Sequence, residues 1–116
     1  MSRRTSQGRR LPFALGLVVA LAVVQVPCVV FAEDLMIEQT GKSFSPATLE
    51  AQIGDTLVFV NNDSVTHNVY SDSVDFIFDL GAQKPGQRVA VKLSRAGTLE
   101  IGCQIHPRME LVVTVR

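Results

Sequence analysis

Three residues that bind soft or borderline metal ions lie close together near the end of the chain. Cys103, His106 and Met109 follow one another at intervals of three residues, so a thiol, an imidazole and a thioether share one short loop. Sulfur and imidazole ligands in this combination suit copper. A thioether is unusual in structural zinc sites, which prefer four cysteine or histidine ligands. The spacing therefore predicts a copper site in this loop.

A further ligand has to come from elsewhere in the chain, which contains only one other histidine, His67. Read alone, His67 could be an ordinary surface histidine and Met109 a core side chain. In a β-sandwich, however, loops that are distant in sequence gather at one end of the sheets. His67 and the loop from Cys103 to Met109 could therefore line the same end of the domain.

The first 32 residues have the pattern of a secretory signal peptide. Four arginines within the first ten residues precede an apolar run over residues 11–31, and Ala32 offers a small residue for cleavage. We expect cleavage after Ala32 and export to the periplasm. A retained membrane anchor stays open as the alternative, because the run is long enough to span a bilayer if it is not cleaved. The arginine pair at residues 9–10 leaves both Sec and twin-arginine export open.

Removal of residues 1–32 changes both the charge and the cysteine count. These residues hold four of the 11 basic residues and none of the 11 acidic ones, so the mature chain has an excess of four acidic residues. A mildly acidic domain is a poor binder of nucleic acid. Cys28 leaves with the signal peptide, and Cys103 becomes the only thiol in an oxidising compartment. Such a thiol is expected to be buried, paired between molecules or bound to metal.

The remaining residues, 33–116, fit one small domain built from short β segments with turns between them. No stretch of useful length has a helical period. The pattern predicts an all-β fold, an antiparallel Greek-key sandwich or barrel of about seven to eight strands. The expected strands are marked by Leu35 and Ile37, Leu49 and Ile53, residues 56–60, His67 and Val69, residues 76–80, residues 89–93, Leu99 and Ile101, and residues 111–115.

These residues resemble the cupredoxins, the small blue-copper electron carriers. The resemblance covers nearly the whole mature domain, and the ligand loop, with two residues between successive ligands and Pro107 after His106, is most similar to the amicyanin and plastocyanin group, amicyanin above all. The matching positions are Phe44, Pro46, Gly54, Asp55, Thr56, Val58, Phe59, Asn61, His67, Asn68, Val69, Pro85, Gly86, Gly97, Cys103, His106 and Met109.

The resemblance implies one type 1 copper ion that alternates between Cu(II) and Cu(I). His67, Cys103 and His106 would be its strong ligands and Met109 the weak axial one. The side chain of Asn68 would tie the two ligand loops together, and its backbone N–H would face the cysteine sulfur. The implied function is that of a periplasmic one-electron carrier rather than an enzyme. A monomer is expected, with redox proteins docking transiently near His106.

Around His106, we expect an apolar rim of Ile105 and Pro107, joined by Leu80 or Met36. The acidic series Asp72, Asp75 and Asp79 has two interpretations. It could attract a basic partner, or it could simply solvate one face of the domain.

Two other functions stay open. A copper-binding or trafficking module without a role in electron transfer would use the same fold, but such sites favour clusters of methionine and histidine. The mature chain has only Met36 and Met109. A purely structural sandwich would keep Cys103 apolar and free of metal.

Overall fold

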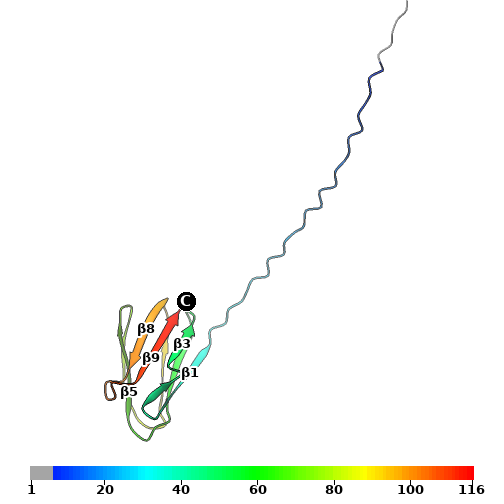
Figure 1. Cartoon of the computed structure of the whole chain (residues 1–116). Helices are drawn as coiled ribbons and strands as arrows, with labels where there is room; N and C mark the ends of the chain where they lie inside the picture. The colour runs from blue at the N-terminus through cyan, green and yellow to red at the C-terminus, as the bar shows by residue number, and fades with distance from the viewer. Residues whose placement is uncertain (1–6) are drawn as a thin grey trace, which may run out of the picture.

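The computed structural model describes residues 7–116, so Arg3 and Arg4 of the expected signal peptide lie outside it. Residues 7–33 form no helix or strand, and Figure 1 shows them as an extended segment that leads away from the folded part. No helix long and apolar enough to cross a bilayer occurs within residues 7–116. The first strand begins at Asp34, two residues after Ala32.

Nine strands make up the fold of the described residues, 7–116. In β4 and β9, every second residue is buried, which is the two-residue period of a strand with one face against a core. The strands are β1 (Asp34–Thr40), β2 (Ser43–Ser45), β3 (Thr48–Ala51), β4 (Thr56–Asn61), β5 (His67–Ser73), β6 (Phe76–Gln83), β7 (Arg88–Lys92), β8 (Gly97–Gly102) and β9 (Glu110–Val115).

The strands form two sheets, with orders β2-β1-β4-β7 and β3-β9-β8-β5-β6. The predicted all-β sandwich is confirmed, but the hydrogen bonding gives two separate sheets rather than a closed barrel. Two pairs, β1 with β4 and β3 with β9, are parallel and not antiparallel. The chain crosses from β2 in one sheet to β3 in the other, so β3 lies beside the last strand and runs in the same direction (Figure 1). Ile53 lies in the turn after β3 and is 55% exposed, so its assignment to a strand was wrong.

The core lies between the two sheets and changes character along its length. Leu57 and Phe59 of β4 are fully buried, and they share one buried cluster with residues of the other sheet such as Leu99 and Val113. Toward one end of the sandwich, the inward-facing residues become polar. Gln39 of β1, Asn61 of β4 and Gln83 of β6 are each 0% exposed.

We call this polar end the ligand end, because the candidate ligands lie there. It consists of the connections at residues 41–42, 62–66, 84–87 and 103–109. The opposite end, called the distal end, consists of the connections at residues 52–55, 74–75 and 93–96. Since β4, β6 and β8 all run toward the ligand end, the residues that follow these strands meet there.

Candidate metal centre

His67 is the first residue of β5, and its side chain is fully buried. The long connection after β4 delivers it to the ligand end, where it pairs with Gln83 of β6. Its two ring nitrogens face different partners: Nδ1 lies 3.1 Å from Nδ1 of His106, and Nε2 lies 2.6 Å from a carboxylate oxygen of Asp63. Because a carboxylate accepts a hydrogen bond from Nε2, the lone pair of Nδ1 is left to face the other candidate ligands.

Cys103 and His106 come from the connection between β8 and β9. Cys103 directly follows β8 and is 2% exposed, whereas His106 is partly exposed. The sulfur of Cys103 lies 3.7 Å from Nδ1 of His106. One ligand atom each from His67, Cys103 and His106 thus lies within 4.8 Å of the other two. The structure brings together three residues that the sequence separates by as many as 39 positions.

These separations fit a bound metal ion. With bonds of about 2.0 Å to nitrogen and about 2.3 Å to sulfur, the lengths typical of zinc sites, two ligands of one ion lie roughly 3–4 Å apart. The 3.1 Å and 3.7 Å distances fall in this range. Two imidazoles with one thiolate are the strong ligands of a type 1 copper site, in which a thioether adds a weak axial contact.

Met109 is placed to supply that thioether. It is the last residue before β9 and is 2% exposed, so its side chain points into the protein and belongs to the same buried cluster as Cys103. Its backbone N–H donates to the carbonyl of His106 over 2.9 Å, which closes a tight turn. This turn fixes the three-residue spacing between His106 and Met109 within the loop.

Asn68 joins the two ligand-bearing segments. Its backbone N–H donates to the Cys103 sulfur over 3.3 Å, and its side-chain oxygen accepts the N–H of Gln104 over 3.1 Å. Its side-chain nitrogen donates to Asp79 over 2.7 Å, and the same Asp79 oxygen accepts the N–H of Gly81. The sequence-based resemblance implied the first two contacts, and it did not anticipate that Asp79 orients the amide.

Asp63 is a part of the site that the sequence reasoning missed, because its segment was interpreted only as a turn. Its carboxylate contacts His67 and also accepts the backbone N–H groups of Gly41 and Lys42, over 2.6 Å and 2.9 Å. Burial by itself would raise the pKa of Asp63, but the contacts with Lys42, His67 and Gly41 outweigh burial and lower it. The available signal was an aspartate four residues before a candidate ligand histidine.

His106 forms the edge of the site toward solvent. Burial lowers its pKa, and the nearby charges of His67 and Lys42 lower it further, against an opposing effect of Asp63. A lowered pKa favours the neutral imidazole, which is the form that binds metal. A groove of about 470 Å³, lined by residues 41–43 and 105–108, adjoins the ring. Ile105 and Pro107 line it as expected, whereas Met36 and Leu80 do not.

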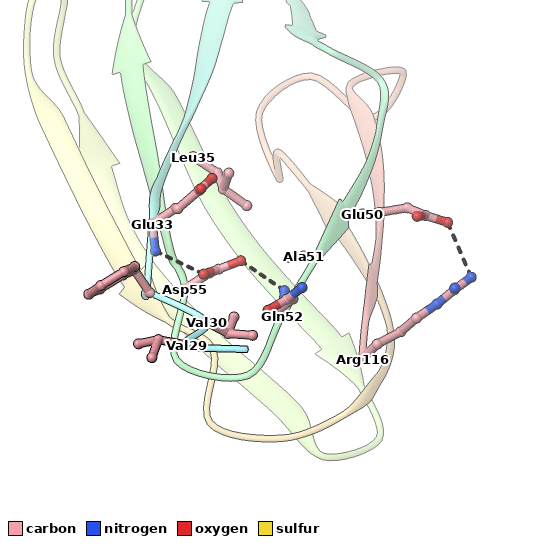
Figure 2. A pocket seen from close by; sticks show the side chains of 10 residues that line it. Val29, Val30, Glu33, Leu35, Glu50, Ala51, Gln52, Asp55 and Arg116 are labelled. Atoms are coloured by element: carbon pink, nitrogen blue, oxygen red, sulfur yellow. Dashed lines mark hydrogen bonds and ion pairs between the residues drawn. The ribbon is translucent and has the colours of Figure 1, made fainter. Parts of the chain in front are cut away.

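A second cavity, of about 520 Å³, lies at the distal end and contains none of the candidate ligands. Figure 2 shows its walls, with Val29 and Val30 beside Glu33 and Asp55. Three of its lining residues, at positions 29–31, belong to the expected signal peptide. This cavity therefore has no part in the candidate metal centre.

The acidic series predicted from sequence lies on the hairpin of β5 and β6. Asp75 lies in the distal turn between β5 and β6, where it pairs with Arg95 over 3.3 Å. Asp79 lies in β6 and is bonded to Asn68. Asp72 of β5 pairs with Ile77, and Tyr70 pairs with Asp79, so Asp72 and Asp79 are diagonal neighbours on adjacent strands while Asp75 lies in the turn that joins them.

Comparisons with known proteins agree with this geometry. A family model described as a cupredoxin-like domain matches residues 15–115. Chloroplastic plastocyanin of Pisum sativum is 31% identical, over 88% of this chain and 73% of its own length. The methylamine utilization protein MauL of Methylorubrum extorquens is 37% identical, over 59% of this chain and 62% of its own length.

Among solved structures, a Cu(I) form of an amicyanin variant has the same fold, with a TM-score of 0.66 at 21% identity over 71% of this chain and 81% of that one. A reduced amicyanin variant, 25% identical, gives a TM-score of 0.65 over the same shares. The match to the family model covers most of the chain. The chain therefore belongs to the cupredoxin-like family, and it is similar to plastocyanin in sequence and to amicyanin in fold.

Proposed function

We propose that this protein is a one-electron carrier that holds a single type 1 copper ion on His67, Cys103, His106 and Met109. The observation that carries the proposal is the convergence of two imidazole nitrogens and one sulfur within 4.8 Å at the end of a rigid sandwich. When bound, copper supplies a Cu(II)/Cu(I) couple. The protein supplies the ligands in a preset arrangement.

The surroundings of the ligands favour electron transfer over catalysis. His67, Cys103 and Met109 are 0–2% exposed, so only His106 meets solvent. The hydrogen bonds of Asn68 to Cys103 and Gln104 hold the two ligand segments in place. A frame of this kind changes little between two charge states, which keeps reorganisation small. Four ligands also leave no open position for a substrate, so we do not assign an enzymatic activity.

Partners would dock at the groove beside His106. Its floor combines the apolar Ile105, 52% exposed, with Pro107, and its charged members are Lys42 and Arg108. None of the described residues that line it is acidic. A redox protein that presents an apolar patch with acidic residues around it would fit this surface, and a small interface allows rapid dissociation.

We further propose that residues 1–32 are a signal peptide, cleaved after Ala32, and that the carrier is a periplasmic monomer. The basic residues followed by a long apolar run support export. The start of β1 at Asp34 supports the boundary, because cleavage after Ala32 would leave every strand intact. Residues 33–116 would then form the single copper domain.

A copper trafficking module is the second candidate, since it would use the same ligands. It differs in requiring that copper leave the protein readily. The burial of His67, Cys103 and Met109 argues against such exchange, because a receiving ligand could approach only along His106.

The deciding experiment loads the purified chain with Cu(II) and records the visible spectrum and electron paramagnetic resonance. A carrier gives an intense blue band from thiolate-to-copper charge transfer and narrow hyperfine splitting. A pale complex would contradict the type 1 site. Incubation with a Cu(I) chelator then separates the two candidates: a carrier exchanges electrons with ferricyanide and ascorbate while it retains copper, and a trafficking module releases the metal.

A further inference from the structure

The carboxylate of Asp63 holds together three parts of the ligand end. Oδ1 accepts the N–H of Gly41 over 2.6 Å, and Oδ2 accepts the N–H of Lys42 over 2.9 Å. The same Oδ2 lies 2.6 Å from Nε2 of His67. The Asp63 side chain is only 12% exposed, so water has little access to these contacts. One carboxylate thus joins the turn between β1 and β2 to a buried ligand.

Neighbouring backbone fixes where this carboxylate lies. Asn61 accepts the N–H of Asp63 over 2.9 Å through its side-chain oxygen, and its side-chain nitrogen donates to the carbonyls of Val65 and Gln83. On the other side, Gly41 and Lys42 have φ angles of 61° and 56°. Two successive residues in the left-handed region form the tight hairpin turn that suits a two-residue connection. The carboxylate is therefore positioned by the fold, independently of any metal.

We propose that Asp63 is a positioning residue that sets the ring orientation and the tautomer of His67 for copper. An ionised carboxylate can only accept hydrogen bonds, so Nε2 of His67 must carry the proton. Nδ1 then keeps its lone pair and faces Nδ1 of His106 at 3.1 Å. A carboxylate on the far nitrogen also makes a ligand histidine more basic. This inference rests on the copper site proposed above.

The charge of Asp63 has a second consequence. A negative charge beside the site favours the more positive of two metal oxidation states, so it stabilises Cu(II) relative to Cu(I). Removal of the charge should therefore raise the reduction potential. Removal of the acceptor should weaken copper binding, because His67 loses its fixed orientation. These two effects can be separated, since asparagine removes the charge but still offers an oxygen to Nε2 of His67.

The experiment compares Asp63→Ala and Asp63→Asn with the wild-type chain, and uses Asp55→Asn as the matched control. Asp55 also accepts two backbone N–H groups, but at the distal end and without a ligand partner. We expect Asp63→Ala to lower the affinity for Cu(II), measured by competition with a chelator, by about 10- to 100-fold. Asp63→Asn should lose less affinity yet still raise the potential. The control should change neither.

A third measurement needs no copper. Nitrogen-15 chemical shifts of the metal-free protein report which ring nitrogen of His67 carries the proton. We expect the Nε2–H tautomer alone in the wild type, and a mixture of tautomers in Asp63→Ala. If Asp63→Ala does not fold, Asp63→Asn decides through its potential.

The proposal is overturned if the Asp63 variants bind copper with wild-type affinity and potential, or if His67 keeps one tautomer without the carboxylate. A wild-type protein that gives no blue band would instead refute the copper-carrier function. The tautomer measurement would still test the role of Asp63 in that case.

Discussion

The same local motif occurs at both ends of β4: an aspartate side chain accepts hydrogen bonds from two backbone N–H groups. Asp55, just before β4, accepts those of Glu33 and Gln52 at 2.9 Å and 2.8 Å, as Figure 2 shows. Asp63, just after β4, accepts those of Gly41 and Lys42. Since β1 pairs in parallel with β4, each aspartate ties one end of β1 to the neighbouring loop.

The ends differ in what else the aspartate contacts. At the distal end, two hydrogen bonds between backbone groups join Leu93 to Gly54 and Asp55, and no candidate ligand contacts Asp55 within the described residues. At the ligand end, Asp63 has the additional partner His67. A local motif that only stabilises a turn at one end thus becomes part of a metal site at the other, because a ligand histidine lies four residues further along the chain.

The buried residues near the two aspartates also differ: they are apolar toward the distal end and polar toward the ligand end. Along β4, the inward-facing residues are Leu57, Phe59 and then Asn61, and along β1 Ile37 is followed by Gln39. The ligand end replaces apolar burial by a hydrogen-bonded amide network: Gln39 donates to Gln83, which donates to the carbonyl of Phe59. Such a network fixes the orientation of the side chains that form it, and it adds little to the net free energy of unfolding. The comparison predicts that changes at the ligand end affect copper, and that changes at the distal end affect folding.

The largest effect should come from Cys103→Ser. Serine offers a hard oxygen in place of the thiolate, so the blue band should be abolished completely while the fold stays intact. The N–H of Asn68, which now donates to sulfur, would keep an acceptor. Visible absorption and circular dichroism test the two parts of this prediction. Persistence of the band would show that Cys103 is not the ligand.

Asp55→Ala should have the opposite profile, with normal copper spectra and a less stable fold. The N–H groups of Gln52 and Glu33 lower the pKa of Asp55. A carboxyl with a lowered folded pKa contributes stability above its unfolded value of about 3.9, and this contribution is lost as the pH falls through the folded pKa. The free energy of unfolding measured in urea should therefore fall more steeply toward acid pH for the wild type than for the variant.

A substitution in the core gives a reference for the stability that Asp55→Ala should lose. Leu57→Ala, at a fully buried position, should cost roughly 2–5 kcal/mol, and Asp55→Ala should cost less. A change in the copper spectrum of Asp55→Ala would break the distinction between the two ends.

The sequence could predict the ligands because three of them occupy one loop. The spacing of Cys103, His106 and Met109 needs no knowledge of the sheets, and turns rich in glycine and proline mark most strand ends. The all-β class followed from these turns and from the short apolar segments between them.

The sequence could not predict Asp63, because its role depends on contacts far along the chain. Gly41 and Lys42 reach its carboxylate only because β1 and β4 are paired in register, so that Gln39 lies opposite Asn61. The same reason explains the parallel pair β3 and β9, which requires the crossing between sheets.

A smaller effect is expected when the charge is changed at either the ligand end or the distal end and the rate of electron transfer is measured. Lys42 lines the groove beside His106, whereas Lys92 ends β7 at the distal end. Lys42→Glu and Lys92→Glu change the net charge equally. We expect Lys42→Glu to slow oxidation of the reduced protein by ferricyanide, an anion, roughly several-fold at low salt, and Lys92→Glu to have little effect.

Stopped-flow rates at increasing salt test this prediction, because screening beyond about 0.1 M should remove most of the difference. Arg108→Glu, on the other side of the groove, should behave like Lys42→Glu. Equal rates for the Lys42 and Lys92 variants at low salt would contradict docking at the ligand end.

The smallest effect concerns the distal end and the expected cleavage after Ala32. Cleavage would turn the N–H of Glu33, 2.9 Å from Asp55, into a charged α-amino group. The carboxylate should raise its folded pKa above the ordinary value of about 7.7–8.0. The stability that this charged α-amino group contributes is fully present below its unfolded pKa and is lost as the pH rises through its folded pKa. Urea unfolding between pH 6 and 10 should show this loss for the processed chain and not for an uncleaved precursor, in which residue 33 carries no charge on its nitrogen. Identical pH profiles would show that Asp55 fastens the distal end through neutral N–H groups alone.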